Sequence, residues 1–145
     1  MRDRLQSYLE EKEAIKQRDY SKQHAKGRLS PMERVELLFD PGTFVEIGML
    51  AEQDLLTQGV KKEPTPRDGV IIGYGKVNGR YVGICAPDIT VKYGSFGLVG
   101  FRKMSELQRL CRKQGFPLVF FLEGSGARLE DEETTLVTNV DNTAV

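Results

Sequence analysis

The stretch "GVIIGYGKVNGRYVGICAPD", residues 69–88, decides the fold that we expect for this sequence. Two runs rich in Val, Ile and Tyr flank the dipeptide Asn78-Gly79. Asn-Gly is the strongest short-range signal for a hairpin, because a type I′ turn needs a positive φ at both central residues. We therefore predict a β-hairpin over these residues.

A helix and then a buried strand are expected after the hairpin. Apolar residues at three- and four-residue steps form one helix face, and they are Leu98, Phe101, Met104, Leu107, Leu110 and Cys111. Gly115 is the expected C-cap of this helix. The run "LVFFLE", residues 118–123, shows no alternation, which is typical of a parallel-sheet strand that is buried on both faces.

A helix with a capping box is expected before the hairpin, within "LSPMERVELLFDPG", residues 29–42. Ser30 is the predicted N-cap, Pro31 fits the first helical position, and Glu33 completes an S-x-x-E box. Asp40-Pro41-Gly42 then ends the helix and turns the chain.

Three other segments carry weaker patterns. Residues 3–23 are a polar helix candidate whose narrow apolar stripe suits a surface or a partner. Residues 43–50 alternate like a strand. Residues 51–68 form a long loop, which is expected to be functional or mobile.

The composition excludes several classes of function. Lys plus Arg and Asp plus Glu number 21 each, so no net charge attracts nucleic acid or an anionic membrane, and neither is expected as a partner. No apolar run approaches the ~20 residues of a transmembrane helix, and the charged N-terminus has no signal-peptide core, so we expect a cytoplasmic protein. One histidine and two distant cysteines predict no metal site.

Two glycine–serine turns are the places where chemistry is possible, Gly94-Ser95-Phe96-Gly97 and Gly124-Ser125-Gly126. A turn of this kind can aim successive N–H groups into one concavity and hold an oxyanion. It can equally be only a turn, and spacing alone leaves both interpretations open. Neither serine has a G-x-S-x-G frame, so a serine nucleophile is not indicated.

Three blocks in order resemble one family. They are "HAKGRLSPMERVELLFDPGTFVEIG", "TPRDGVIIGYGKVNGRYVGICAPDITVKYGSFG" and "GFPLVFFLEGSGARLED", within residues 24–131. Together they resemble the biotin-dependent carboxyltransferases of the acyl-CoA carboxylase beta-subunit type, in the crotonase-like superfamily. The resemblance covers the N-terminal part of that family.

The resemblance implies an α/β fold, a partial crotonase-like ββα spiral that N-terminal helices precede. We expect an N-terminal helical segment at residues 1–29 and a partial acyl-CoA carboxyltransferase N-terminal domain at residues 30–131. Residues 132–145 no longer look like the family and are predicted to be an exposed or disordered tail.

The resemblance also implies an activity. The chain would be the acyl-CoA-binding half of a carboxyltransferase that moves CO2 from carboxybiotin to the α-carbon of an acyl-CoA, through an enolate held by backbone amides. A partner protein would supply the carboxybiotin, and no metal is expected. Biotin carboxyl carrier and biotin carboxylase components would be partners, within a homo- or hetero-oligomer of fatty acid metabolism. Two alternatives stay open, a non-catalytic fragment or assembly module and the half-site of a biotin-dependent acyl-CoA decarboxylase.

Site residues follow from the resemblance by position. Ser125 and Gly126 match the glycine pair of the family's first oxyanion hole and are the expected catalytic residues. Substrate-binding positions are expected nearby and in a basic N-terminal segment assigned to structure or to the CoA phosphates; they are Gly94, Ser95, Gly97, Ala127, Arg128, Lys26, Arg28 and Arg34. Two departures from the family pattern are a serine at 125 in place of glycine and a glutamate at 123 in place of aspartate.

Overall fold

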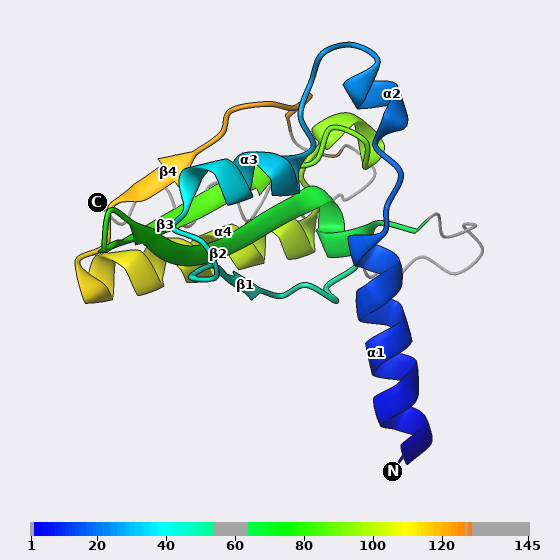
Figure 1. Cartoon of the computed structure of the whole chain (residues 1–145), viewed down its shortest axis with the longest axis horizontal. Helices are drawn as coiled ribbons and strands as arrows, with labels where there is room; N and C mark the ends of the chain where they lie inside the picture. The colour runs from blue at the N-terminus through cyan, green and yellow to red at the C-terminus, as the bar shows by residue number, and fades with distance from the viewer. Residues whose placement is uncertain (1, 54–63, 127, 129–145) are drawn as a thin grey trace.

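A four-stranded sheet with the order β1-β2-β3-β4 organises the chain (Figure 1). The computed structural model describes residues 2–53, 64–126 and 128. The strands are β1 (Val45–Ile47), β2 (Val70–Val77), β3 (Arg80–Pro87) and β4 (Leu118–Phe120). β1 and β3 pair antiparallel with β2, and β4 pairs parallel with β3.

The predicted hairpin is confirmed, and it is the longest pairing of this sheet. β2 and β3 pair from Val70↔Pro87 to Val77↔Arg80, so Asn78 and Gly79 form a two-residue turn. Their φ angles are 50° and 78°, as a type I′ turn requires. The Asp40 carboxylate accepts hydrogen bonds from both turn N–H groups, at 3.0 and 2.9 Å. The turn that ends the preceding helix therefore also holds the tip of the hairpin.

Two helices cover opposite faces of the sheet (Figure 1). Helix α3 (Pro31–Leu38) packs where Ile71 and Ile84 point, and helix α4 (Leu98–Gln114) packs where Val70 and Ile72 point. Neighbouring residues of β2 thus alternate between two cores, because side chains of a strand point to opposite faces in turn. The hairpin is buried on both sides for this reason.

The predicted helix caps are confirmed. The Ser30 hydroxyl accepts from the Glu33 N–H at 3.2 Å, and the Glu33 carboxylate accepts from the Ser30 N–H at 2.6 Å. His24 contacts the same carboxylate at 2.8 Å, and mainly for this reason the pKa of Glu33 is lowered to about 2. Gly115 ends α4 in the left-handed conformation at φ 71°.

The single helix expected at residues 3–23 is wrong. The structure has α1 (Arg2–Lys16) and a separate short α2 (Ser21–His24), and Figure 1 shows α1 projecting away from the sheet. The Asp19 carboxylate accepts from the Ser21 N–H at 2.8 Å, a local bond that competes with a continuous helix.

The buried strand expected at residues 118–123 is only partly correct. β4 covers three residues, all half-buried, and Leu122 is 89% exposed. The expected parallel pairing is confirmed, and the partner strand is β3. Among the described residues β4 has a strand on one side only, so its second edge and part of its faces remain uncovered.

The long loop expected at residues 51–68 is described only at its two ends. Its last residues form a 3-10 turn, η1 (Pro66–Gly69), and a second such turn, η2 (Lys92–Gly94), follows β3. Residues 54–63 and the predicted tail, 132–145, lie outside the described residues.

Replacing the N-cap of α3 tests the capping box. Ser30→Ala removes the acceptor of the Glu33 N–H, and we expect it to lower the free energy of unfolding by about 1 kcal/mol. Urea denaturation measures the loss. Ser7→Ala, on the exposed surface of α1, is the control and should change stability by less than about 0.5 kcal/mol. Equal effects of the two substitutions would show that the cap does not stabilise α3.

Candidate functional site

The two glycine–serine turns pack backbone against backbone at Gly94 and Gly124. A Cβ atom at Gly124 would lie 2.3 Å from the Gly94 carbonyl oxygen, and a Cβ at Gly94 would lie 3.0 Å from the Gly124 Cα. Real Cβ atoms do not approach other atoms as closely as 2.3 Å, so glycine is required at 124 for this contact. Two segments 30 positions apart thereby meet in one site.

Two hydrogen bonds set the register between these segments. The Phe96 N–H donates to the Gly126 carbonyl at 2.9 Å, and the Arg128 N–H donates to the Phe96 carbonyl at 2.8 Å. Gly126 and Arg128 are therefore both joined to the backbone of Phe96.

The turn presents two backbone donors to its surroundings. Ser125 and Gly126 are exposed, and within the described part of the chain their N–H groups donate to no acceptor. The positive φ angles of the turn fall on Gly124 (157°) and Gly126 (94°) and not on Ser125. The serine that departs from the family pattern therefore occupies a position without the backbone strain that favours glycine.

A buried ion pair lies beneath the two turns. Arg128 Nη1 donates to Asp68 Oδ1 at 2.7 Å and to Gln53 Oε1 at 2.9 Å, while Arg128 Nη2 donates to the Ser95 carbonyl at 2.9 Å. The side chains of Arg128 and Asp68 are 3% and 0% exposed. The Ser95 hydroxyl also points inward, since it donates to the Lys92 carbonyl at 2.7 Å.

The other Asp68 oxygen reaches helix α4. Asp68 Oδ2 accepts from the Gly100 N–H in the first turn of α4 at 2.6 Å, while Gly97 supplies the N-cap position without a side chain. A carboxylate suits the positive end of the helix dipole. Asp68 and Gln53 were not predicted from the sequence, because "PRDG" looks like an ordinary turn and the partners of Asp68 are 32 and 60 positions away.

A second buried charged group lies next to the ion pair. Lys103 of α4 donates to the carbonyls of Arg67 and Val70 at 2.8 and 2.7 Å. Burial lowers the pKa of Lys103 from 10.5 to about 8, against the nearby carboxylates of Glu46 and Asp68, which raise it. Arg67 itself is paired with Glu46, with Nε to Oε1 at 2.6 Å and Nη2 to Oε2 at 3.1 Å.

Two predicted basic residues contact Glu123, which directly precedes the Gly124-Ser125-Gly126 turn. Arg34 Nη2 lies 2.5 Å from Glu123 Oε2, and Arg28 Nη1 lies 3.8 Å from Glu123 Oε1. The Arg34 guanidinium also lies over the Phe121 ring, 5.9 Å from its centroid. The structure therefore brings Arg28 and Arg34 beside the turn from the N-terminal segment.

The third predicted basic residue, Lys26, lines a cleft beside the same turn. The cleft has a volume of about 580 Å³ and is lined by Asp19, Tyr20, Lys22, Gln23, Lys26, Arg28, Ile89, Thr90, Lys92 and Tyr93. Four of these residues are cations and one is an acid. Arg28 belongs both to the cleft and to the ion pair with Glu123, and Tyr93 precedes Gly94, so the cleft adjoins the turn.

Hydrogen bonds join the two segments that contain the lining residues of this cleft, residues 18–28 and residues 88–93. The Tyr20 hydroxyl donates to Asp88 Oδ2 at 2.7 Å, and Arg18 Nε donates to Thr90 Oγ1 at 3.1 Å. Burial, together with the Asp88 carboxylate, raises the pKa of Tyr20 well above its usual value. The hydroxyl therefore stays a donor to Asp88, and the segment after α1 is held against residues 88–93.

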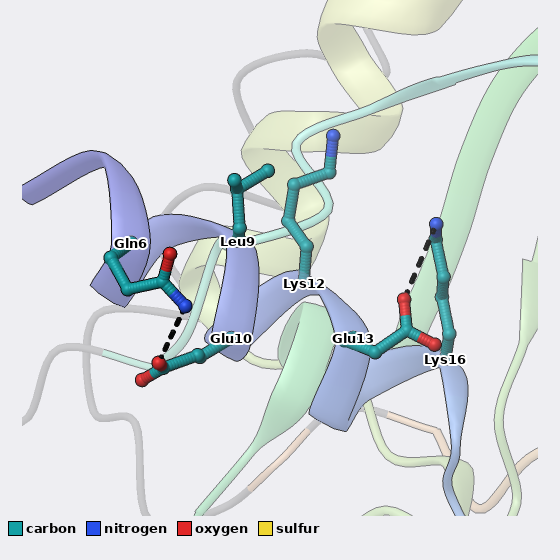
Figure 2. Close-up of a pocket in the computed structure, with 6 residues that line it drawn as sticks. All are labelled: Gln6, Leu9, Glu10, Lys12, Glu13 and Lys16. Carbon is teal, nitrogen blue, oxygen red and sulfur yellow. Dashed lines mark hydrogen bonds and ion pairs between the residues drawn. The ribbon is translucent and has the colours of Figure 1, made fainter. Parts of the chain in front are cut away.

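Other features carry no site of this kind. A groove along α1 is lined by Gln6, Leu9, Glu10, Lys12, Glu13 and Lys16. Figure 2 shows two pairs of these side chains joined along the helix itself, Gln6 with Glu10 and Glu13 with Lys16. Within the described residues no three His, Cys, Asp or Glu side chains form a group that could hold a metal ion. None of the described helices is long and apolar enough to cross a membrane. Ala127 lies outside the described residues.

Comparison with known proteins identifies similar sequences. The family model described as "Carboxyl transferase domain" matches residues 22–142. The methylmalonyl-CoA decarboxylase subunit alpha of Veillonella parvula is 38% identical over 110 residues, which are 76% of this chain and 22% of that protein. The biotin-dependent acetyl-/propionyl-coenzyme A carboxylase beta5 subunit of Mycobacterium leprae (strain TN) is 38% identical over 117 residues, 81% of this chain and 21% of that protein.

A similar structure is known as well. Transcarboxylase 12S, solved as a hexamer with methylmalonyl-coenzyme A and methylmalonic acid bound, matches with a TM-score of 0.86 and 30% identity, over 97% of this chain and 28% of that chain. This likeness confirms the expected α/β, partial crotonase-like fold. The chain spans between 21% and 28% of the length of these three proteins.

The buried lysine predicts a pH dependence of stability. Lys103 has a pKa of about 8 in the folded protein against an ordinary 10.5, so the unfolded chain binds more protons between these pH values. The free energy of unfolding should therefore rise with pH in this window, by up to about 1.4 kcal/mol per pH unit. Lys103→Met should flatten that rise, measured by urea denaturation at a series of pH values.

The range from pH 8 to pH 9 is the most informative for this measurement. Burial raises the pKa of Cys85 from 9.0 to about 12, so above pH 9 its thiol makes stability fall and opposes the lysine. Lys12→Met, on exposed α1, is the control and should leave the pH profile unchanged. A wild-type profile that Lys103→Met does not alter would contradict a lowered pKa for Lys103.

Proposed function

This chain belongs to the carboxyl transferase domain family, and from that membership we propose that it supplies the acyl-CoA side of a biotin-dependent carboxyltransferase. The proposed reaction moves CO2 from carboxybiotin to the α-carbon of an acyl-CoA through an enolate. The observation that carries the proposal is the pair of exposed N–H donors at Ser125 and Gly126, in a turn that a glycine contact and a buried ion pair support.

The proposed role of the turn is electrostatic. In the net exchange the α-proton of the acyl-CoA would end on the biotin nitrogen that gives up CO2. Loss of that proton places negative charge on the thioester oxygen. Donors that already point at that oxygen stabilise the charge without reorganising, and one such donor is worth about 3 kcal/mol. The N–H groups of Ser125 and Gly126 would be these donors, so no nucleophilic side chain is needed at the site.

The basic cleft is the proposed place for the phosphates of the same substrate. Lys22, Lys26 and Arg28 surround it, and a phosphate oxygen accepts hydrogen bonds from such cations. Tyr93 is 82% exposed on the lining and offers a ring face for stacking. Because the cleft adjoins the oxyanion turn, one acyl-CoA would occupy both, with phosphates in the cleft and the thioester at the turn.

The biotin would lie elsewhere. Bound to a carrier protein, carboxybiotin supplies the CO2 of the reaction. Its ureido oxygen needs hydrogen-bond donors of its own. The N–H groups of Ser125 and Gly126 would already be bound to the thioester oxygen. The biotin site would therefore be formed by residues other than the described ones or by a partner.

The components that surround this half-site are part of the proposal. Biotin carboxylase and biotin carboxyl carrier components would be its partners in a cytoplasmic oligomer. Residues 30–131 would form the carboxyltransferase part and residues 1–29 a helical segment beside it. A hexamer is described for transcarboxylase 12S, which supports an oligomer.

A second candidate function is decarboxylation of an acyl-CoA. The 38% identity to a methylmalonyl-CoA decarboxylase subunit alpha supports it, and the identity to the carboxylase beta5 subunit is the same. Loss of CO2 from the α-carbon forms the same enolate, so Ser125 and Gly126 would serve it equally. A non-catalytic assembly module is the remaining alternative, and it predicts binding without turnover.

The oxyanion role is tested by a variant that removes one donor. Ser125→Pro deletes an N–H group, and we expect carboxyl transfer to propionyl-CoA, assayed with biotin components added, to fall by about 100-fold or more. The carbonyl ¹³C resonance of bound [1-¹³C]propionyl-CoA should also move back toward its value in water, because one polarising donor is lost.

The matched control keeps the donor at the same position. Ser125→Ala retains the N–H group and should retain both the transfer rate and the carbonyl shift. Carboxyl transfer that survives Ser125→Pro would refute the oxyanion assignment. A wild-type chain that shifts the resonance but never turns over with any component added would favour the assembly module.

The cleft is tested by binding measurements. Lys26→Ala should weaken binding of propionyl-CoA by about tenfold in calorimetry, since a hydrogen bond to a charged group is worth about 1.5 kcal/mol or more. Binding of propionyl-pantetheine, which has no nucleotide phosphates, should not change. Lys113→Ala, at the exposed end of α4, is the control. Equal losses for both ligands would place the phosphates elsewhere.

A further inference from the structure

We propose that the buried ion pair of Asp68 and Arg128 positions the oxyanion donors, and that Arg128 does not bind substrate. The inference rests on the proposed function for its catalytic meaning, although the positioning itself can be measured without substrate. It assigns a role to Asp68 and changes the role expected for Arg128.

The guanidinium of Arg128 is fully engaged inside the protein. Its Nη atoms donate to Asp68 Oδ1 at 2.7 Å, Gln53 Oε1 at 2.9 Å and the Ser95 carbonyl at 2.9 Å, and the side chain is 3% exposed. A substrate phosphate or carboxylate could reach it only by leaving the Asp68 carboxylate buried and unpaired. An unpaired charge in the protein interior is strongly unfavourable, so Arg128 stays paired with Asp68.

The same guanidinium links the two turns. Arg128 lies two positions after Gly126, and its side chain donates a hydrogen bond to the Ser95 carbonyl in the facing turn. Its own N–H donates to the Phe96 carbonyl at 2.8 Å. One residue therefore holds the facing turn through both its backbone and its side chain, directly after the donors at Ser125 and Gly126.

Asp68 fixes this arrangement to the rest of the fold. While Oδ1 accepts from Arg128, Oδ2 accepts from the Gly100 N–H of α4 at 2.6 Å. The carboxylate is fully buried, so both oxygens depend on these donors. The turn is thereby tied to the first turn of a 17-residue helix that packs against the sheet.

Positioning matters because oxyanion donors act only over a short range. A donor must lie about 2.7–3.1 Å from the developing oxyanion. Gly126 has no side chain that could anchor the exposed turn, and no atom lies within 4 Å of the place where its Cβ would be. The contacts that hold the donors in place therefore come from the Gly94–Gly124 approach, from the Phe96 N–H that donates to the Gly126 carbonyl, and from Arg128.

The test compares the carboxylates of two ion pairs, the fully buried Asp68 and the partly buried Glu46, by NMR on the 145-residue chain. Asp68→Asn neutralises the partner of Arg128, and Glu46→Gln neutralises the partner of Arg67, which touches neither turn. In the wild type the ¹⁵N order parameters of Ser125 and Gly126 should match those of β3. Asp68→Asn should lower them below about 0.6, the range of flexible backbone, and Glu46→Gln should leave them unchanged.

The bound thioester gives the functional readout. With [1-¹³C]propionyl-CoA as the probe, Asp68→Asn should lose more than half of the wild-type carbonyl shift while calorimetry shows the affinity kept, since the cleft is untouched. Glu46→Gln should keep both. A wild type without any carbonyl shift, but with order parameters that respond as expected, would refute the proposed function and leave the positioning role standing.

A second variant covers the case in which Asp68→Asn does not fold. Arg128→Lys keeps a positive charge for Asp68 and cannot form the planar fork to Gln53 and the Ser95 carbonyl. It should lower the order parameters of Ser125 and Gly126 in the same direction. Order parameters that stay at the wild-type value in either folded variant would overturn the inference.

Discussion

The Asp68 carboxylate is fully buried, and the arrangement of the candidate site depends on how its charge is satisfied. Removing a carboxylate from water costs several kcal/mol unless donors replace the lost hydration. Here the donors are the Arg128 guanidinium and the Gly100 N–H, which belong to different parts of the chain. Satisfying one charge therefore brings together the segment before β2, the start of α4 and the turn that follows β4.

The site is assembled from segments that precede the central hairpin in the sequence and segments that follow it. β2 and β3 hold their register over eight residue pairs, and a helix closes each face. The turns that follow β3 and β4 then lie next to each other, because these two strands run parallel and end on the same side. The basic cleft lies beside them, because its lining residue Arg28 pairs with Glu123 and its lining residue Tyr93 directly precedes Gly94.

Local patterns predicted the elements well where the cause of the structure is local. The Asn78-Gly79 turn, the Ser30–Glu33 capping box and the glycine end of α4 all depend on residues within a few positions of one another. The prediction failed where distant contacts decide. The first helix ends at Lys16, and the residues after it are held by Asp88 and Thr90, some 70 positions away. β4 has the composition of a buried strand and is half-buried, since burial depends on its neighbours.

The sequence by itself determined the hairpin, the caps, the turn residues and the three ordered blocks that identify the family. The resemblance to that family also indicated Ser125 and Gly126 as donors, and this role stays a prediction. Only the tertiary structure decided which charges are buried. Nothing in "PRDG" distinguishes Asp68 from a surface turn residue. Nothing in the sequence around Arg128 distinguishes an arginine that binds substrate from one in a buried ion pair. The energy of a charge depends on what surrounds it in space, and folding brings those surroundings from 32 and 60 positions away.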